Sequence, residues 1–366
     1  MKILVSAFSN LYTDQRIEKV CDTLYRNGYQ VELIGNTWGG EPMMERPYPF
    51  VRIDHSQTSL RRAYVEFQFK LYRELKKRAD KNTILLANDL DALLPNTLMA
   101  KKLNIPLVFD SHEIFTEMPA IKGRFTQKIW KYLEERLVPG MKYMMTESQS
   151  YADWFRTEYG VHPVVIRNIP RKITETIDIP ENSPKIILYQ GAINQSRGIP
   201  QAIMAMKNID NAVFKIIGDG PKKEEYEALV RKEKLEEKII FLGKLHPDVL
   251  RKVTRTADIG LSVEENGGVS YLYSLPNKVA DYIQSKVPLV MINFPEMKRV
   301  YEWFKVGELI ENHHPETMAA AITAVLKRGR SFYLPELEKA ANELCWEKEE
   351  PKILSLFKKV EKENFH

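Results

Sequence analysis

The segment Pro276-Asn277-Lys278, followed by Asp281, offers a cation, amide groups and a carboxylate close together in the sequence. Proline is favoured in the first turn of a helix, so this segment predicts a helix over Pro276–Ser285. The unpaired N–H groups of a first turn attract anions, and Asn277 and Lys278 lie in that turn. We therefore predict a nucleoside diphosphate site, with the phosphates at the helix end and the ribose at Asp281. The alternative is a solvated Lys278–Asp281 pair on an ordinary helix.

Two glycine turns in the same half of the chain follow apolar strand candidates. Gly191 follows Lys185–Gln190 and precedes Arg197, whose guanidinium can bind a phosphate with two parallel hydrogen bonds. Gly218 follows Ala212–Ile217 and opens a second turn. Neither turn has the spacing of a dinucleotide or P-loop fingerprint, so each is also compatible with a purely structural strand-to-helix turn.

A further group of polar residues follows a strand candidate in the N-terminal half, Pro106–Ser111. Asp110, His112 and Glu113 lie at the end of this strand. A histidine beside two acids can bind a sugar hydroxyl or transfer a proton. The alternative is a histidine that only satisfies carbonyl groups of its loop.

The first strand candidate, Lys2–Phe8, also leads into polar residues. Asn10 fits a tight turn that faces the ligand side, and Asp14 is expected to cap a helix. Arg16, in the first turn of that helix, can reach an anionic group.

Length and composition limit the class of protein. The chain has 366 residues, of which 44% are hydrophobic and 28% charged, and a formal net charge of +5. This describes a globular protein of two domains, and the charge is too small to indicate nucleic-acid binding. Cys21 and Cys345 form neither a disulfide framework nor a metal-binding spacing, which favours the cytoplasm. There is no apolar run of the ~20 residues that a membrane span needs.

The predicted elements alternate between strand and helix in both halves, which is typical of doubly wound α/β domains with parallel sheets. In the N-terminal half we expect strands over 2–8, 31–35, 83–88, 106–111 and 142–146 and helices over 14–27, 64–81, 90–103 and 128–138. In the C-terminal half we expect strands over 185–190, 212–217, 239–242, 259–263, 288–292 and 308–310 and helices over 199–207, 221–234, 247–255, 276–285, 295–304 and 315–327. Five of the latter helices begin at a proline.

These elements predict two Rossmann-like domains that face each other across a cleft. We place the N-terminal domain at 1–168 and the C-terminal domain at 169–335, with a proline-punctuated linker after Val164. The tail, 336–366, is expected to be helical and can pack back on the N-terminal domain. Ligands bind at the carboxyl ends of the strands in such sheets, so the marked residues should line the cleft.

The order of these motifs resembles glycosyltransferase family 4, retaining enzymes of the GT-B fold, over nearly the whole chain. The segments that carry the resemblance are Lys2–Val5, Asp14–Val20, Leu24–Val31, Phe109–Glu113, Asn168–Pro170, Tyr189–Gly198, Ile217–Pro221, Phe241–Gly243 and Leu275–Pro288.

This resemblance implies a metal-independent hexosyltransferase without a cofactor. It implies that the first domain holds a glycan or glycolipid acceptor and the second holds a nucleotide-sugar donor, in cell-surface polysaccharide or glycolipid assembly. The implied catalytic residues are His112, Arg197 and Lys278; the implied donor-binding residues are Gly191, Gly218, Asn277 and Asp281; and the residues of the acceptor or cleft loops are Asn10, Arg16, Asp110 and Glu113.

Two positions depart from the family pattern. The family often has an arginine where this chain has Ala192, and the first Glu of its E-x7-E motif falls at Tyr273. The second Glu of that motif corresponds to Asp281. These departures leave two alternatives open: a nucleotide-sugar epimerase of the same architecture, or a catalytically degenerate nucleotide-binding protein.

The segment from Arg61 to Arg78 is basic and aromatic, as is Lys122–Tyr132. Basic amphipathic helices can lie on anionic lipid, so an anionic membrane surface is a further candidate partner. Tyr64, Phe67 and Leu71 belong to one apolar stripe of the first segment. The alternative is a helix that packs by this stripe and is solvated on its charged side.

Overall fold

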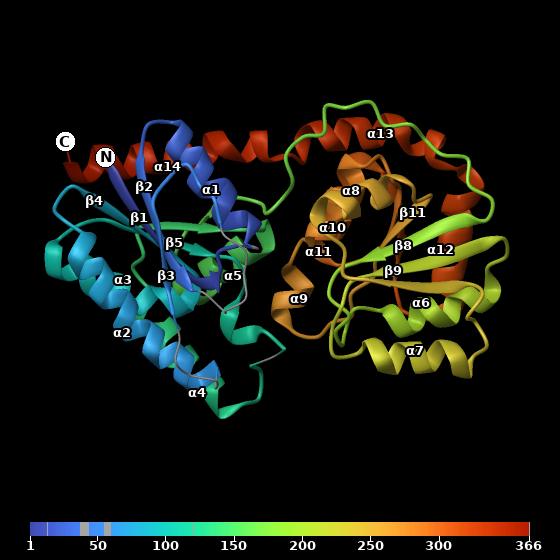
Figure 1. Ribbon diagram of the computed structural model, residues 1–366, viewed down its shortest axis with the longest axis horizontal. Coiled ribbons are helices and arrows are strands. Elements are labelled where there is room, and N and C mark those ends of the chain that lie inside the picture. The colour runs from blue at the N-terminus through green and yellow to red at the C-terminus, as the bar shows by residue number, and fades with distance from the viewer. Residues whose placement is uncertain (13, 37–43, 55–59, 120, 366) are drawn as a thin grey trace. The chain divides into compact units, whose positions relative to one another are not determined.

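The protein is described by a computed structural model, which covers residues 1–12, 14–36, 44–54, 60–119 and 121–365. The chain divides into two compact units, each built around one parallel sheet (Figure 1). Unit 1 consists of Met1–Asn168 together with Glu349–His366, and unit 2 consists of Ile169–Lys348. The chain therefore passes from one unit to the other twice, after Asn168 and after Lys348.

The sheet of unit 1 has seven parallel strands in the order β3-β2-β1-β4-β5-β6-β7. Its strands are β1 (Lys2–Asn10), β2 (Gln30–Asn36), β3 (Phe50–Ile53), β4 (Thr83–Asn88), β5 (Leu107–Ser111), β6 (Tyr143–Thr146) and β7 (Val164–Val165). Every residue of β4 is buried. Such a continuous buried run is expected of a parallel strand covered on both faces.

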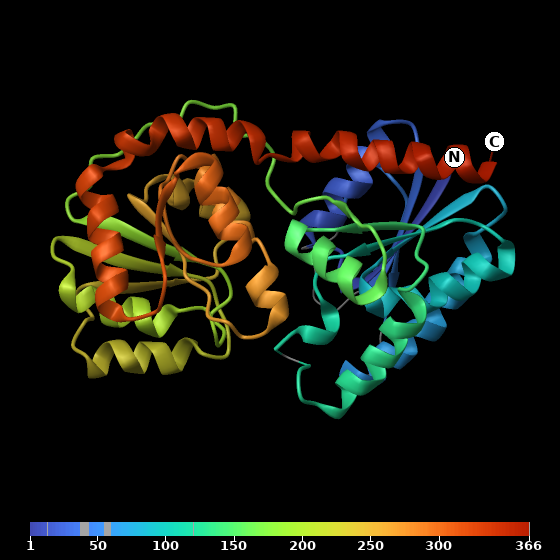
Figure 2. The same ribbon diagram turned by 180° about the vertical axis from the view of Figure 1, so that it is seen from behind.

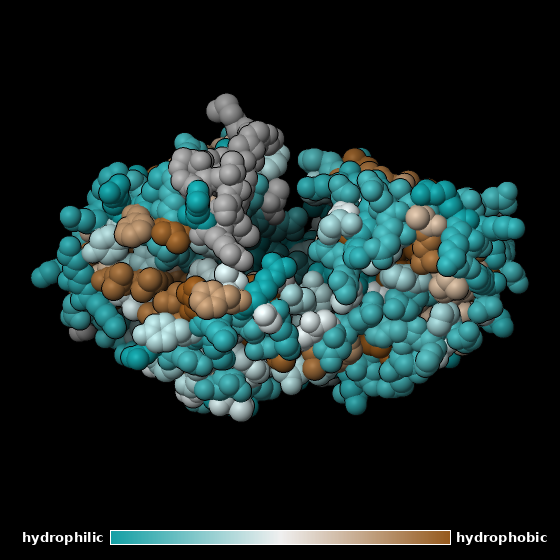
Figure 3. Space-filling model, turned by 90° about the horizontal axis from the view of Figure 1, so that it is seen from below, coloured by the Kyte–Doolittle hydropathy of each residue, from teal (hydrophilic) through white to brown (hydrophobic). Residues whose placement is uncertain are grey.

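The helices of unit 1 are α1 (Gln15–Arg26), α2 (Leu60–Arg78), α3 (Asp89–Leu103), a 3-10 turn (Phe115–Glu117), α4 (Phe125–Leu137), α5 (Gln149–Tyr159) and α14 (Trp346–Phe365), whose first residues belong to unit 2. Asp14 caps α1 as expected, since its side chain accepts a hydrogen bond from the N–H of Ile17 (3.1 Å). On the face drawn in Figure 3, brown apolar side chains stay exposed among hydrophilic ones over α2 and α4.

The sheet of unit 2 has six parallel strands in the order β10-β9-β8-β11-β12-β13. Its strands are β8 (Lys185–Gln190), β9 (Ala212–Ile217), β10 (Ile239–Gly243), β11 (Ile259–Ser262), β12 (Leu289–Ile292) and β13 (Gly307–Ile310). Its helices are α6 (Ile199–Ala205), a 3-10 turn (Met206–Asn208), α7 (Lys223–Lys232), α8 (Pro247–Arg255), α9 (Val269–Tyr273), α10 (Asn277–Gln284), α11 (Pro295–Phe304), α12 (Pro315–Arg328) and α13 (Arg330–Glu343).

The predicted fold class is confirmed: both units are doubly wound α/β layers with all-parallel sheets. Several element boundaries differ from the prediction. Three of the five expected proline starts occur, in α8, α11 and α12, whereas α7 begins two residues after Pro221 and Pro276 is the cap of α10.

The C-terminal residues are shared between the units. Residues 336–348, which we assigned to the tail, belong to unit 2, because Leu337, Ala340 and Leu344 are part of its core. Only the segment from Glu349 onward belongs to unit 1, and Figure 2 shows α14 lying along it.

In each sheet the strand order reverses beside the first strand. The reversal lies between β1 and β4 in unit 1 and between β8 and β11 in unit 2. Ligands of open α/β sheets bind at the carboxyl ends of the strands at such a switch point. The loops after these four strands are therefore the places to look for a site.

Candidate functional site

The turns after β8 and β9 pack backbone against backbone. Gly191 and Gly218 adopt φ angles of 137° and 146°, which disfavour any residue with a side chain. A Cβ atom on Gly218 would lie 1.8 Å from the carbonyl oxygen of Gly191. Glycine is therefore required at 218 for the Gly191 turn to keep its place.

Lys278 lies in the first turn of α10 and pairs with a residue from the switch point. Its Nζ atom lies 2.7 Å from Oε1 of Glu264, which follows β11, and 4.0 Å from the centroid of the Tyr189 ring. The side chains of Lys278 and Glu264 are only 8% and 1% exposed. Lys278 is thus a buried cation held by Glu264, not half of a solvated pair with Asp281.

Arg197 lies in the loop between β8 and α6. Its guanidinium stacks on Tyr271, 4.5 Å from the ring centroid, and donates a hydrogen bond to the Tyr271 hydroxyl (3.2 Å). Burial raises the pKa of Glu264, but Lys278 and Arg197 oppose it and hold the pKa of that carboxyl below its usual value. Two cations therefore act on one carboxylate. We call Tyr189, Arg197, Glu264, Tyr271 and Lys278 the unit 2 cluster.

Asp281 ties α10 to the end of β8. Its Oδ2 atom accepts a hydrogen bond from Nε2 of Gln190 (3.1 Å), whose Oε1 in turn accepts one from Thr254 (2.7 Å). The buried Tyr282 hydroxyl donates to the Leu188 carbonyl and accepts from the Gln190 N–H, both at 3.1 Å. These bonds fix the start of α10 beside the Gly191 turn, with Asn277 exposed as its first residue.

Arg16 forms a buried ion pair in unit 1. Nε and Nη2 donate to Oδ2 and Oδ1 of Asp110 (3.0 and 2.6 Å), and Nη1 donates to the Ile166 carbonyl (2.6 Å). Arg16 is 1% exposed and Asp110 is fully buried. We expected Arg16 to reach an anionic ligand; instead its guanidinium is occupied by protein groups, so this pair has a structural role.

The His112 ring is held by polar groups on both of its nitrogens. Nδ1 lies 3.3 Å from Asp89, while Nε2 lies 3.4 Å from Asp110 and 3.2 Å from Asn88. Burial alone lowers the pKa of His112, but the carboxylates of Asp89 and Asp110 raise it to about 10. At neutral pH the ring is therefore a cation that donates hydrogen bonds, and it cannot accept a proton as a base.

Two further acids belong to this region. Asp89 follows β4 with a left-handed φ of 59°, and its Oδ1 accepts a hydrogen bond from the His112 N–H (2.8 Å). Burial raises the pKa of Glu147, which follows β6, to about 8, so its carboxyl group is largely protonated at neutral pH. We call Arg16, Asp89, Asp110, His112 and Glu147 the unit 1 cluster.

The other two predicted residues of unit 1 lie at its loops. The Asn10 side chain accepts a hydrogen bond from the Tyr12 N–H (2.9 Å), which fits the expected turn, and the Asn10 carbonyl accepts one from the Asp14 N–H (3.0 Å). Glu113 is exposed. Thr13 in this turn lies outside the described residues.

Sequence reasoning missed the role of three acids, Asp89, Glu147 and Glu264. Asp89 and Glu147 directly follow a strand, and Glu264 lies two residues after one. This position is the signal that would have pointed to them. It also missed His313. Its Nε2 atom lies 3.1 and 3.0 Å from the carbonyl oxygens of Val263 and Glu264, so it supports the backbone that carries Glu264.

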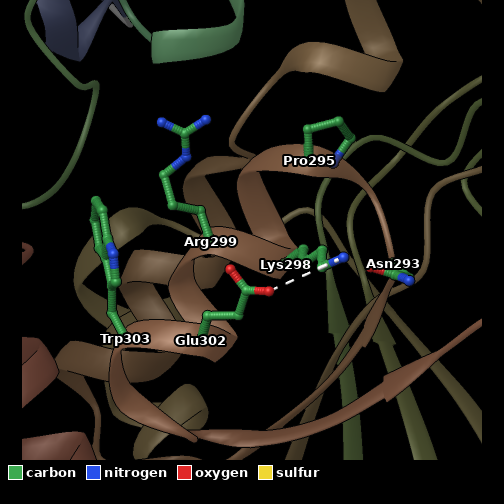
Figure 4. A pocket seen from close by; sticks show the side chains of 6 residues that line it. All are labelled: Asn293, Pro295, Lys298, Arg299, Glu302 and Trp303. Atoms are coloured by element: carbon green, nitrogen blue, oxygen red, sulfur yellow. Dashed lines mark ion pairs between the residues drawn. The ribbon is translucent and has the colours of Figure 1, made fainter.

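A separate pocket of unit 2 contains none of the predicted site residues. It is lined by the residues shown in Figure 4, Asn293, Pro295, Lys298, Arg299, Glu302 and Trp303. They come from the end of β12 and from α11, and Lys298 and Glu302 form an ion pair across one helical turn (4.0 Å). The pocket lies at the carboxyl end of β12, in the same unit as the unit 2 cluster.

Two family models match the chain, one after the other. "Glycosyltransferase Family 4" matches residues 15–173, and "Glycosyl transferases group 1" matches residues 172–343. The chain belongs to the GT4-type glycosyltransferases of the GT-B fold.

Solved structures of this fold are similar over nearly the whole chain. Sucrose-phosphate synthase from Thermosynechococcus elongatus matches with a TM-score of 0.80 and 13% identity, over 98% of this chain and 99% of that one. Anabaena Alr3699/HepE in complex with UDP matches with a TM-score of 0.73 and 14% identity, over 98% and 100%. WaaG, a glycosyltransferase involved in lipopolysaccharide biosynthesis, matches with a TM-score of 0.69 and 13% identity, over 96% and 99%.

Among curated proteins, the uncharacterized glycosyltransferase MJ1607 of Methanocaldococcus jannaschii is 26% identical over 151 residues. This match covers 40% of the present chain and 37% of the relative, so it spans well under half of either protein.

Proposed function

We propose that this chain transfers a hexosyl group from a nucleoside-diphosphate sugar to an acceptor hydroxyl, with retention of the anomeric configuration and without a metal ion. The observation that carries the proposal is the unit 2 cluster, in which Lys278 and Arg197 both act on Glu264. Two cations beside one carboxylate leave positive charge available to an incoming diphosphate. The cluster lies at the switch point of its sheet, where this fold class binds nucleotides.

The proposed reaction follows from where negative charge develops. As the bond between the sugar and the diphosphate breaks, the leaving group gains charge. Lys278, Arg197 and the N–H groups at the start of α10 would stabilise that charge. These fixed positive groups supply the electrostatic function that a metal ion serves in other transferases.

The other residues take supporting roles in this proposal. Gly191 and Gly218 keep the turns free of side chains, so that backbone can approach the phosphates. Asp281 would bind the ribose, and Asn277, as the first residue of α10, would lie at the phosphates. His112 would face the donor sugar as a hydrogen-bond donor, since its raised pKa excludes a role as a base at neutral pH.

The chemical class of the substrates is also part of the proposal. The donor is a nucleotide sugar and the acceptor a glycan or glycolipid, in assembly of a cell-surface polysaccharide or glycolipid. The similar HepE structure is a complex with UDP, and the similar WaaG acts in lipopolysaccharide biosynthesis, which supports these classes.

The test begins with thermal unfolding of the protein in the presence of UDP-, GDP- and ADP-sugars, with the matching nucleosides as controls. We expect one nucleotide sugar to raise the melting temperature and its nucleoside to have little effect, because the diphosphate makes the main contacts. The stabilising donor is then incubated with candidate acceptors in excess EDTA, and the anomeric configuration of the product is read by NMR.

Three outcomes contradict the proposal. Conversion of the nucleotide sugar to its epimer without an acceptor would show an epimerase. Binding without transfer or hydrolysis would show a degenerate binding protein. Inversion at the anomeric carbon, or complete loss of transfer in EDTA, would refute the retaining and metal-independent parts.

A further inference from the structure

Three helices of unit 1 expose large apolar side chains that the proposed reaction does not use. These side chains are 50% to 75% exposed and comprise Val65 and Phe69 on α2, Leu98 on α3, and Phe125, Ile129 and Tyr132 on α4. Helix α3 contacts both α2 and α4, so the three helices form one continuous layer. Single exposed apolar residues are common on proteins, but a group of them on one layer indicates an interaction surface.

The apolar stripe that the sequence marked on α2 does not belong to this surface. Phe67, Leu71 and Leu75 are fully buried, and Tyr64 is half-buried and stacks on Phe8 with ring centroids 4.2 Å apart. This stripe attaches α2 to the sheet, as the alternative interpretation held. The exposed apolar residues lie on the opposite side of the helix.

The exposed side of α2 carries two apolar residues flanked by basic ones. Arg62, Val65, Phe69, Arg73 and Lys76 are all exposed and are spaced by three or four positions, so they lie along one face. The side chain of Arg61 is outside the described part of the helix.

Helix α4 repeats this arrangement. Phe125, Lys128, Ile129, Tyr132 and Arg136 are exposed and follow the same helical spacing. The Arg136 guanidinium lies over the Tyr132 ring, 5.4 Å from its centroid. Helices α2 and α4 thus both expose apolar side chains together with basic ones.

The exposed charged side chains of this layer are positive, with a single exception on α4. On the described parts of α2 and α3 every exposed charged side chain is basic, and on α4 only Glu135 is acidic. The acids that α2 does carry, Glu66 and Glu74, are mostly buried and paired with lysines or arginine of the same helix. The surface therefore suits an extended partner that is both anionic and able to take up apolar side chains.

We propose that this face, which we call the docking face (Arg62, Val65, Phe69, Arg73, Lys76, Phe125, Lys128, Ile129, Tyr132 and Arg136), binds the surface of a bilayer that contains anionic lipids. The aromatic and aliphatic side chains enter the headgroup region, and the arginines and lysines contact lipid phosphates. An anionic bilayer is the occupant that this combination favours, because the basic side chains on α2 and α4 would repel a second copy of the same face. Among the described residues no helix is long and apolar enough to cross a membrane, so the contact is peripheral.

The test is flotation of the purified full chain with vesicles of phosphatidylcholine alone and with vesicles in which phosphatidylglycerol replaces part of that lipid. Two double variants alter the docking face: Arg73→Glu with Lys128→Glu, and Phe69→Ser with Phe125→Ser. Matched controls alter unit 2, where Lys339→Glu reverses an exposed charge and Phe332→Ser removes an aromatic ring that is 63% exposed. Thermal unfolding of each variant confirms that its fold is intact.

We expect the wild-type protein to float only with the anionic vesicles, and less so as salt is raised. Each basic residue near an anionic surface contributes about 1 kcal/mol, or roughly fivefold in partitioning, so the charge reversals should weaken binding by at least about 20-fold. The serine variant should weaken it by at least about tenfold, and the unit 2 controls should bind as the wild type does.

The proposal is overturned if the wild type does not float with anionic vesicles, or if the docking-face variants float as well as their controls. It is also overturned if sedimentation velocity shows a stable dimer that Phe69→Ser with Phe125→Ser dissociates, because the face would then be an interface between copies. None of these readouts depends on transferase activity.

Discussion

Both units place a group of charged side chains at the carboxyl end of a parallel sheet, yet the balance of charge differs. In the unit 1 cluster, Arg16 and the protonated His112 are matched by the carboxyl groups of Asp89 and Asp110, with Glu147 close by. In the unit 2 cluster, Arg197 and Lys278 share the one carboxylate of Glu264.

This difference separates a structural ion pair, Arg16–Asp110, from a candidate anion site in unit 2. All three guanidinium nitrogens of Arg16 donate to protein groups, and the side chain is only 1% exposed, so an anionic ligand cannot reach it. Two cations around a single carboxylate leave a net positive charge that can bind an anion. The same residue types at equivalent strand ends can therefore serve stability in one unit and anion binding in the other.

The largest expected effect tests the structural half of this comparison. Asp110→Asn removes the charge that compensates the buried Arg16, and breaking such a pair costs about 3–5 kcal/mol of unfolding free energy. Denaturant unfolding, followed by a probe in unit 1, measures it. Asp153→Asn is the matched control, because Asp153 pairs with Arg156 at an exposed site and its loss should change little. Equal effects of the two substitutions would show that the Arg16–Asp110 pair contributes no more to the free energy of unfolding than an exposed ion pair does.

The next effect tests the unit 2 cluster as the site of charge stabilisation. Arg197→Ala and Lys278→Ala should each lower the rate of sugar transfer by ~10²–10³, because a donor to the leaving diphosphate is lost. Arg197→Ala is the cleaner variant, since Glu264 keeps its partner Lys278. Lys298→Ala removes an exposed lysine of the same unit and should leave the rate unchanged. Near-normal turnover in both cluster variants would refute the assignment.

The smallest effect concerns the pH dependence of the unit 1 cluster. The folded protein raises the pKa of His112 to about 10, above the ~6.5 of an unfolded chain. The stability that His112 contributes is therefore fully present below about pH 6.5 and is lost as the pH rises through about 10.

Melting temperatures of the wild type and His112→Gln, measured across this range, test the prediction. The wild type should melt higher at pH 6.5, and the gap should close toward pH 10. The raised pKa of Glu147 also lowers stability with rising pH, but it is common to both proteins and largely cancels in the difference. His246→Gln, at an exposed site, is the control. A gap that stays constant with pH would mean that the His112 ring is neutral.

Much of the fold could be predicted because buried parallel strands are continuous apolar runs. β4, β8 and β9 have the predicted bounds, and the glycine turns after β8 and β9 follow directly. The elements that were missed include α5 and β7, for different reasons. Helix α5 has a Ser148 cap and ends at Gly160 with φ 69°, a signal that we did not use. The two-residue β7 has no period of its own and exists through its pairing with β6.

The chemistry of the site was less predictable than its location. Sequence spacing suggested the local partner Asp281 for Lys278, whereas the tertiary structure brings Glu264 from the end of β11. Likewise, Asp110 was marked correctly at a strand end, but nothing local indicated that Arg16 would be its partner across 94 residues of sequence. Partner choice depends on which strand ends meet at a switch point, and that information is not local.

The chain passes between the two units twice, and this affects the order in which the units can fold during synthesis. Unit 1 is discontinuous: Glu349, which is fully buried, binds Arg167 through Oε1 (2.7 Å), and Phe357 and Val360 are buried in unit 1 as well. Glu363 also accepts a hydrogen bond from the Tyr143 hydroxyl (2.8 Å). During synthesis on the ribosome, the N-terminal sheet emerges first but lacks this last helix until unit 2 has been translated. Unit 2 is continuous and can finish folding earlier, so the half of the protein that begins first is the half that is completed last.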